Sequence, residues 1–303
     1  MSFSFRTFSN LLTVFTLAIL VAACGGNPQK DRQEAEKAAF EQAEKKISSD
    51  LDQVIKDLPS PTEVPYLLQA TGSDFDASLI NGLDKLSNYE TNEDESALNL
   101  GVYATDMGYL LSYEKVSDSR EYLQACQKLA EALGIASVFD VKTIEKFQAN
   151  LNNSDSLNSL LSAAIVDVEA KLEESDRVSV AALILTGSFV EGLYLAVKVI
   201  ETYPTDILDE QTRNLILEPM VKVVLDQKKP LMDVIDMLND LPQDDIIAKM
   251  ITELNILRIF YEGDLAEIQE KISNNTGDFI LTQDMLIDIT TEVKRVRGDI
   301  VDF

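Results

Sequence analysis

Histidine is absent from all 303 residues of the sequence. Because histidine is the commonest general base and a usual zinc ligand, its absence excludes histidine-dependent triads, ordinary zinc sites and the Glu-x-x-His di-iron pattern of helical bundles. The sequence also has no P-loop, no dinucleotide-binding glycine pattern after a strand and no EF-hand loop. We therefore expect a protein that is not an enzyme, with no cofactor and no metal site.

Basic residues are scarce: 26 lysines and arginines stand against 52 aspartates and glutamates, which gives a formal net charge of −26. A field of this sign repels nucleic acid and anionic lipid headgroups. It would suit a cationic partner or metal ions, although solubility is the simpler interpretation. The charge therefore predicts that the protein has no nucleic-acid partner.

Cysteine occurs only twice, and the first, Cys24, follows a segment typical of a secretory signal. Arg6 precedes an apolar run over residues 11–23 that only two threonines interrupt. This run is too short to span a bilayer as a helix. We expect residues 1–23 to be a signal peptide and residues 24–30, which include two glycines and a proline, to be a tether.

The end of the run, Val21-Ala22-Ala23-Cys24, resembles the lipobox of bacterial lipoproteins. The resemblance implies that Cys24 becomes the first residue, diacylated on its sulfur and acylated on its new amine. At about 0.8 kcal/mol per buried CH₂, two or three acyl chains anchor a protein essentially permanently. Gly25 in place of aspartate implies transfer to the outer membrane. Gln29-Lys30-Asp31 resembles a surface-export signal of Bacteroidota lipoproteins, so both the periplasmic face and the cell surface stay open.

Once Cys24 is lipidated, Cys126 has no partner within the chain, which excludes a disulfide framework. Cys126 lies in "YLQACQKLAEALGI", where apolar residues recur at helical spacing. This pattern predicts a small buried side chain and not a reactive thiol.

Helical periodicity dominates the rest of the sequence. Residues 31–58 carry an apolar stripe at steps of three and four and are predicted to form an amphipathic helical arm, ended by Pro59-Ser-Pro61. Residues 62–70 predict a short helix, and residues 73–92 are polar and turn-rich, a candidate functional loop. Further helices are predicted at 93–115, 118–133, 140–151, 155–175, 178–202, 206–228, 230–240, 244–273 and 283–299.

No segment alternates with period two, so the predicted fold is all-α, with about ten to eleven helices. Residues 59–303 are expected to form one domain, either bundle-like or an irregular α-solenoid. Three local signals refine its helix ends. Asp118 with Glu121 predicts a capping box, Gly134 a C-terminal cap, and Pro219 a kink or a division of its helix.

Two predicted helices are almost wholly apolar and carry one acid each: Asp106 in residues 96–113 and Glu191 in residues 178–197. The second segment is long enough to cross a bilayer. Its internal acid, its two glycines and the amphipathic helices around it favour instead a central helix of a soluble domain. In the first helix, small residues form one stripe that would let another helix approach closely: Ala97, Gly101, Thr105, Gly108 and Ser112.

A buried carboxylate without a partner costs several kcal/mol, so each acid needs one. Either Asp106 and Glu191 bond a nearby tyrosine, serine, helix end or basic residue such as Lys198, or they serve a ligand. In the second hypothesis they line one pocket for a cation, an amine or a sugar-like polar molecule. The predicted pocket residues are Tyr103, Asp106, Tyr109, Glu191 and Tyr194.

The segments "ALNLGVYATDMGYLLSY", "YLQACQKLAEALGI" and "GSFVEGLYLA" resemble all-helical lipoproteins of Bacteroidota to which no activity is attached. The first functional hypothesis is therefore a non-enzymatic, outer-membrane lipoprotein that binds or scaffolds envelope proteins. Amphipathic helices such as residues 31–58 and the C-terminal helix would dock on partner grooves. The alternative is binding of a small polar or cationic ligand at Asp106 and Glu191.

Overall fold

The computed structural model describes residues 46, 49, 63–70, 72–150, 153–173, 177–203, 210–274 and 283–302. The predicted signal peptide, Cys24 and its tether lie outside these residues, as does the predicted arm except for Lys46 and Ser49. The chain from Ile47 to Phe303 forms one compact unit.

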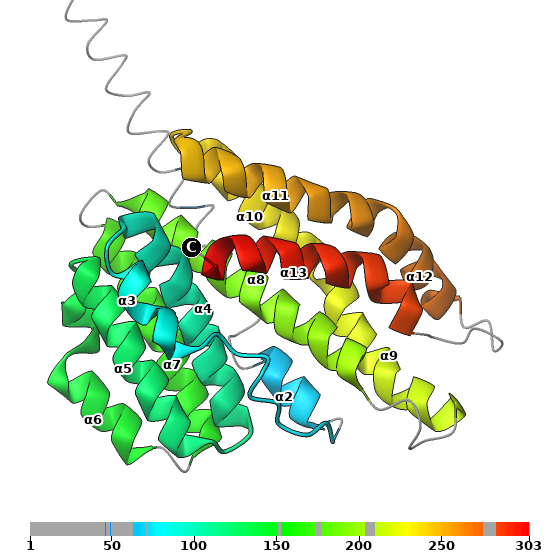
Figure 1. The fold of residues 1–303 in the computed structure, drawn as a ribbon, viewed down its shortest axis with the longest axis horizontal. Helices are drawn as coiled ribbons and strands as arrows, with labels where there is room; N and C mark the ends of the chain where they lie inside the picture. The colour runs from blue at the N-terminus through cyan, green and yellow to red at the C-terminus, as the bar shows by residue number, and fades with distance from the viewer. Residues whose placement is uncertain are drawn as a thin grey trace, which may run out of the picture. The chain divides into compact units, whose positions relative to one another are not determined.

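The described residues are 84 % helical and contain no strand, which confirms the predicted all-α class. Figure 1 shows α3 to α7 on one side of α8 and α9 to α13 on its other side. The α-helices are α2 (Glu63–Ala70), α3 (Leu86–Tyr89), α4 (Glu93–Ser112), α5 (Val116–Ala132), α6 (Val141–Ala149), α7 (Ser154–Glu173), α8 (Val178–Thr202), α9 (Glu210–Asp226), α10 (Lys228–Asp240), α11 (Asp245–Glu262), α12 (Asp264–Ser273) and α13 (Ile287–Val301). Short 3₁₀ turns are η1 (Leu83–Lys85), η2 (Ala136–Phe139) and η3 (Gln283–Leu286).

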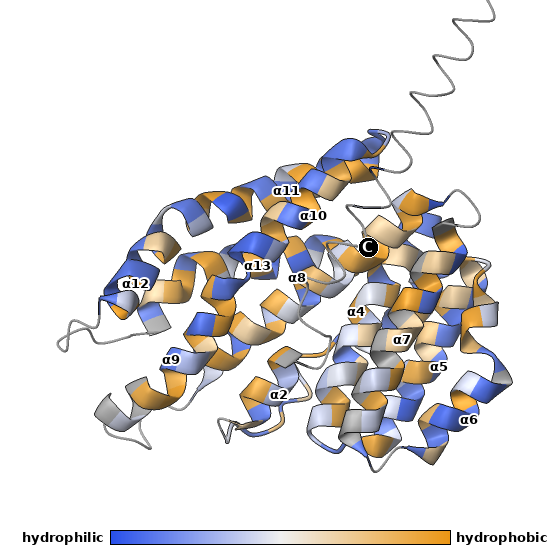
Figure 2. Ribbon diagram, turned by 180° about the vertical axis from the view of Figure 1, so that it is seen from behind, coloured by the Kyte–Doolittle hydropathy of each residue, from blue (hydrophilic) through white to orange (hydrophobic). Residues whose placement is uncertain are grey.

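The α8 helix lies at the centre of the domain because most of its residues are apolar and buried, and Figure 2 shows it coloured largely as hydrophobic. It packs most extensively against α4 and also contacts α2, α7, α9, α10 and α13. Among the described residues, α8 is the one helix long and apolar enough to span a bilayer, and 89 % of its most apolar 18-residue window is buried in the protein. Other helices of the domain therefore cover the apolar surface of α8.

Glycines let α4 and α8 approach closely. A Cβ on Gly101 would lie 2.1 Å from the carbonyl oxygen of Ile184, and a Cβ on Gly187 would lie 2.0 Å from that of Leu98. Both distances are far below van der Waals contact, so no larger residue fits at this spacing. The small-residue stripe predicted on α4 is confirmed at Gly101, and α8 supplies a matching glycine.

Of the two end signals predicted for α5, the structure confirms the C-terminal one and contradicts the N-terminal one. Gly134 ends α5 in the left-handed region at φ +71, as predicted. The predicted capping box of Asp118 is wrong, because α5 already begins at Val116 and its N-cap residue, Lys115, makes no side-chain cap. Asp118 therefore lies inside the first turn, where a negative charge is favoured by the helix dipole.

Three segment predictions also need correction. The helix predicted over 244–273 is divided at Gly263, which leaves the helical region at φ −105 and ψ −106. The loop predicted over 73–92 contains η1 and α3. Pro219 lies inside a continuous α9, so the predicted division of this helix is wrong, whereas the kink stays a prediction.

Candidate functional site

The single acids of the two apolar helical segments meet at the centre of the domain. Asp106 comes from α4 and Glu191 from α8, and both residues are 0 % exposed. Their carboxyl groups lie close enough for Glu191 to raise the pKa of Asp106. The close approach of α4 and α8 at their glycines brings the two carboxyls together, although 85 positions separate them in the sequence.

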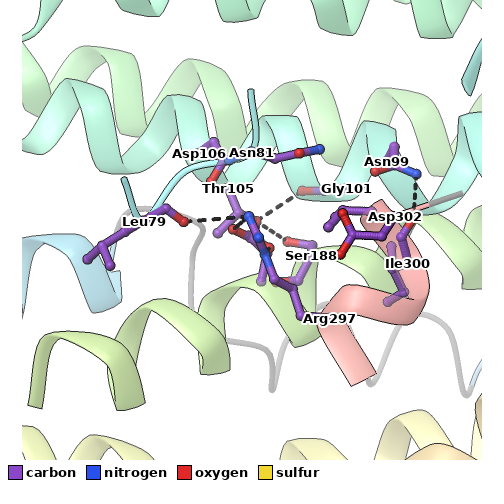
Figure 3. A network of polar contacts seen from close by, with 12 residues as sticks. Leu79, Asn81, Asn99, Gly101, Thr105, Asp106, Ser188, Arg297, Ile300 and Asp302 are labelled. Atoms are coloured by element: carbon purple, nitrogen blue, oxygen red, sulfur yellow. Dashed lines mark hydrogen bonds and ion pairs between the residues drawn. The ribbon is translucent and has the colours of Figure 1, made fainter. Parts of the chain in front are cut away.

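Arg297 of α13 neutralises one of these acids. Its Nε donates to Glu191 Oε2 at 2.8 Å and its Nη2 to Glu191 Oε1 at 3.0 Å, a bidentate pair. The guanidinium carbon lies 4.3 Å from the centroid of the Tyr194 ring, a cation–π contact, and Nη2 lies 3.5 Å from the carbonyl oxygen of Leu79. Figure 3 shows Arg297 reaching between the Leu79 segment and the α4 and α8 side chains.

Asp106 makes different contacts. Its Oδ2 accepts the backbone N–H of Asn81 at 3.0 Å, whereas its Oδ1 is buried and has no standard hydrogen-bond partner among the described residues. Asn81 is itself fixed from two sides: its Nδ2 donates to the Tyr89 hydroxyl at 3.1 Å, and its carbonyl accepts from the Tyr122 hydroxyl at 2.6 Å. The segment predicted as a functional loop thus supplies a backbone donor to a buried acid.

The electrostatics of the pair follow from burial and from like charge. Burial raises the pKa of Asp106 well above its ordinary value, the neighbouring Glu191 raises it further, and Arg297 partly offsets both. For Arg297, burial alone lowers the pKa, but the ion pair with Glu191 outweighs burial and the net shift of the pKa is upward. Arg297 therefore stays charged, and Asp106 favours its protonated form.

The predicted pocket tyrosines separate into two groups. Tyr194 stacks on Arg297, and Tyr103 lies beside Asp106 and donates to the carbonyl of Gly82 at 3.0 Å. Tyr109 instead accepts the backbone N–H of Asp76 at 3.2 Å and packs against Phe75. The structure thus brings Tyr103, Asp106, Glu191 and Tyr194 together and places Tyr109 in another cluster.

Polar side chains of α3 and α4 also hydrogen-bond to the end of α13. Asn99 Nδ2 donates to the carbonyl of Ile300 at 3.0 Å, and the Tyr89 hydroxyl donates to the carbonyl of Val301 at 2.7 Å (Figure 3 labels Asn99 and Ile300). Asn99 of α4 and Tyr89 of α3 therefore satisfy carbonyls at the C-terminal end of α13.

Sequence reasoning missed Arg297 and suggested Lys198 instead. Lys198 pairs with Glu201 on the surface of α8. A signal for Arg297 exists in the last helix, because it lies between Val293, Val296 and Ile300 on the apolar face, where a solvated arginine is not expected. A charged residue on an apolar face predicts a buried partner of opposite charge, and Glu191 is that partner.

Outside this centre, a cleft of about 90 Å³ lies between α4, α5 and α6, with an apolar floor and an amide-rich rim. No group of three or more potential metal ligands occurs among the described residues. The cleft is lined by Met107, Leu111, Ser119, Arg120, Leu123, Gln124, Gln127, Ile144, Phe147 and Gln148.

The cysteine prediction is confirmed: Cys126 is 1 % exposed and unpaired, and burial raises the pKa of its thiol to about 12.

Compared with known protein families, with curated proteins and with solved structures, the chain matches none. Its function has to be inferred from its own residues and their geometry.

Proposed function

We propose that the chain is a non-enzymatic lipoprotein of the outer membrane, anchored by lipid on Cys24, whose helical domain binds or scaffolds envelope proteins. The observation that carries this proposal is the closure of the polar centre. Asp106 and Glu191 are 0 % exposed, and the second is held bidentately by Arg297. A catalytic or ligand-binding carboxylate has to reach its substrate, and these two have no access to one.

The same geometry weighs against the small-ligand alternative. A cationic ligand at Glu191 would have to displace the guanidinium of Arg297, which is already bidentate and stacked on Tyr194. The ligand would therefore have to compensate the loss of a buried ion pair before it gained affinity. This cost favours scaffolding over ligand binding at the acid pair.

The predicted arm of residues 31–58 is the element best suited to a protein partner. The C-terminal helix, which we also expected to dock on a partner, uses its apolar face inside the domain, where α13 packs against α4, α8 and α11. The arm carries a narrow apolar stripe of the kind that fits a hydrophobic groove on another protein.

Lipid anchoring in the outer membrane is tested by metabolic labelling of the full chain with an alkyne-tagged palmitate, followed by separation of inner and outer membranes. We expect the label on the wild-type protein in the outer-membrane fraction. The matched variant Cys24→Ser should carry no label and should leave that fraction. A labelled Cys24→Ser protein, or an unlabelled wild type, would refute the anchoring.

The binding role is tested by crosslinked pull-down of the native lipoprotein from its envelope. We expect a defined set of envelope proteins that is lost when Ile47→Lys and Leu51→Lys disrupt the apolar stripe of the arm. Ser49→Lys is the matched control, since Ser49 is exposed and the predicted helix would place it about 200° around the axis from Ile47. An unchanged set in the double variant would contradict docking through the arm.

A further inference from the structure

We propose that Asp106 and Glu191 hold one proton between them in the folded domain, and that this proton stabilises the packing of α13 over the pair. The proton is the ligand of the site. We call the contact of Arg297 of α13 with the acid pair the clasp, and its strength depends on pH. This inference concerns the domain alone and does not depend on lipid anchoring or on an envelope partner.

The atoms of the pair require a proton. Glu191 uses both carboxylate oxygens on Arg297, and Asp106 uses Oδ2 on the N–H of Asn81. Asp106 Oδ1 has no standard donor among the described residues, although it is buried against another carboxyl group. Two ionised acids would leave one buried charge uncompensated and two acceptors in contact. A proton on Oδ1 turns that atom into a donor to Glu191 and satisfies both groups.

The groups facing the pair from the packed elements offer no second positive charge. Burial raises the pKa of Tyr89 to about 12 and of Cys126 to about 12, and it raises the pKa of the other tyrosines, so all these groups stay neutral near pH 7. Arg297 is therefore the one cation facing the pair within the described part of the chain. The facing groups are Tyr89 of α3, Tyr103 of α4, Tyr122 and Cys126 of α5, Glu191 and Tyr194 of α8, and Arg297 of α13.

The clasp acts on α13 because α13 supplies the arginine. Opening of α13 withdraws Arg297 and gives Asp106 access to water, where an aspartate titrates near pH 4. The docked form, with its raised pKa, keeps the proton to higher pH. Above about pH 4 the equilibrium constant for docking therefore falls by up to tenfold for each pH unit, until the docked form also loses the proton.

The experiment compares hydrogen exchange of the α13 amides, corrected for intrinsic rates, in the full mature chain in detergent between pH 5 and 8. The variants are Asp106→Asn, which keeps a donor and an acceptor at the same place but cannot titrate, and Asp118→Asn, an exposed acid on α5. Relative to Asp106→Asn, the opening constant of the wild type should rise up to tenfold per pH unit, a change of about 1.4 kcal/mol. Asp118→Asn should follow the wild type.

Parallel pH profiles of the wild type and Asp106→Asn over this range would overturn the proposal. Should Asp106→Asn fail to fold, the infrared spectrum of the wild type decides. At pH 7 the native chain should show the carbonyl band of a protonated carboxylic acid, and unfolding should abolish it. A native spectrum without that band would overturn the proposal equally.

Discussion

Replacing Arg297 by methionine should destabilise the domain by about 3–5 kcal/mol, because it leaves a buried carboxylate without its counter-charge. The magnitude follows from the geometry. Glu191 is 0 % exposed and would lose hydrogen bonds of 2.8 and 3.0 Å. The stacking of the guanidinium on Tyr194, at 4.3 Å, is lost as well.

Arg295 provides a matched control two residues earlier in the same helix. It forms ion pairs with Glu253, Glu292 and Asp299, more than Arg297 does, but its side chain is 42 % exposed. Because exposed pairs are worth little, Arg295→Met should cost no more than about 1 kcal/mol. Urea unfolding of both variants measures the difference. In thermal unfolding, the loss at Arg297 corresponds to a fall in Tm of roughly 6–20 °C for a domain of this size.

Equal losses from the two arginine variants would refute the reasoning. Such a result would mean that burial of the Glu191 pair adds nothing to its strength. A loss that is larger at Arg295 would refute it more strongly, because the exposed network would then outweigh the buried pair.

Three further predictions concern packing, capping and thiol reactivity. Gly101→Ala and Gly187→Ala should each lower the free energy of unfolding in urea by about 1–3 kcal/mol, because the added Cβ meets backbone atoms at close to 2 Å. The control Gly192→Ala, with nothing within 4 Å of its Cβ, should raise that free energy by up to about 1 kcal/mol. A Gly101→Ala domain that is more stable than the wild type would contradict the close packing of α4 on α8. Asn92→Ala removes the N-cap of α4 and should cost about 1 kcal/mol by the same assay, so an unchanged midpoint would show that the cap is dispensable. Cys126 should resist alkylation at pH 8 in the native protein and react fully in urea, because its thiol is buried with a pKa near 12; rapid native modification would contradict its burial.

The central helices could be predicted because their sequence patterns are strong. The bounds predicted for the most apolar helix, 178–202, coincide with α8 (Val178–Thr202), since a long apolar run with an internal acid is typical of a central helix. The close contact at Gly101 was also predictable, because a stripe of small residues on a helix lets a neighbouring helix approach closely.

Features that depend on tertiary contacts could not be predicted. The short helix α3 lies in a polar, turn-rich stretch and is held by the hydrogen bond from Tyr89 to Val301, near the other end of the chain. The break at Gly263 falls within a continuous apolar periodicity, so the pattern favours one helix where the structure has two. In both cases local propensity is overridden by contacts that a single sequence does not reveal.

The acid pair itself lies between these extremes. The sequence indicates that Asp106 and Glu191 are buried, and the structure adds that they meet. The partner could not be chosen correctly from proximity in sequence, which favoured Lys198. Arg297 contacts Glu191 across 106 positions, and only the path of α13 brings it there.

A double-mutant cycle between Glu191 and Arg297 tests most directly whether the polar centre is a closed structural clasp. The measurement is the free energy of unfolding of Glu191→Gln, Arg297→Gln and the double variant in urea. A clasp predicts that each single variant is strongly destabilised and that the double variant recovers part of the loss, with a coupling energy of about 2–3 kcal/mol. A ligand site, where retained charge strains the fold, predicts instead that Glu191→Gln alone stabilises the domain and that the coupling is near zero.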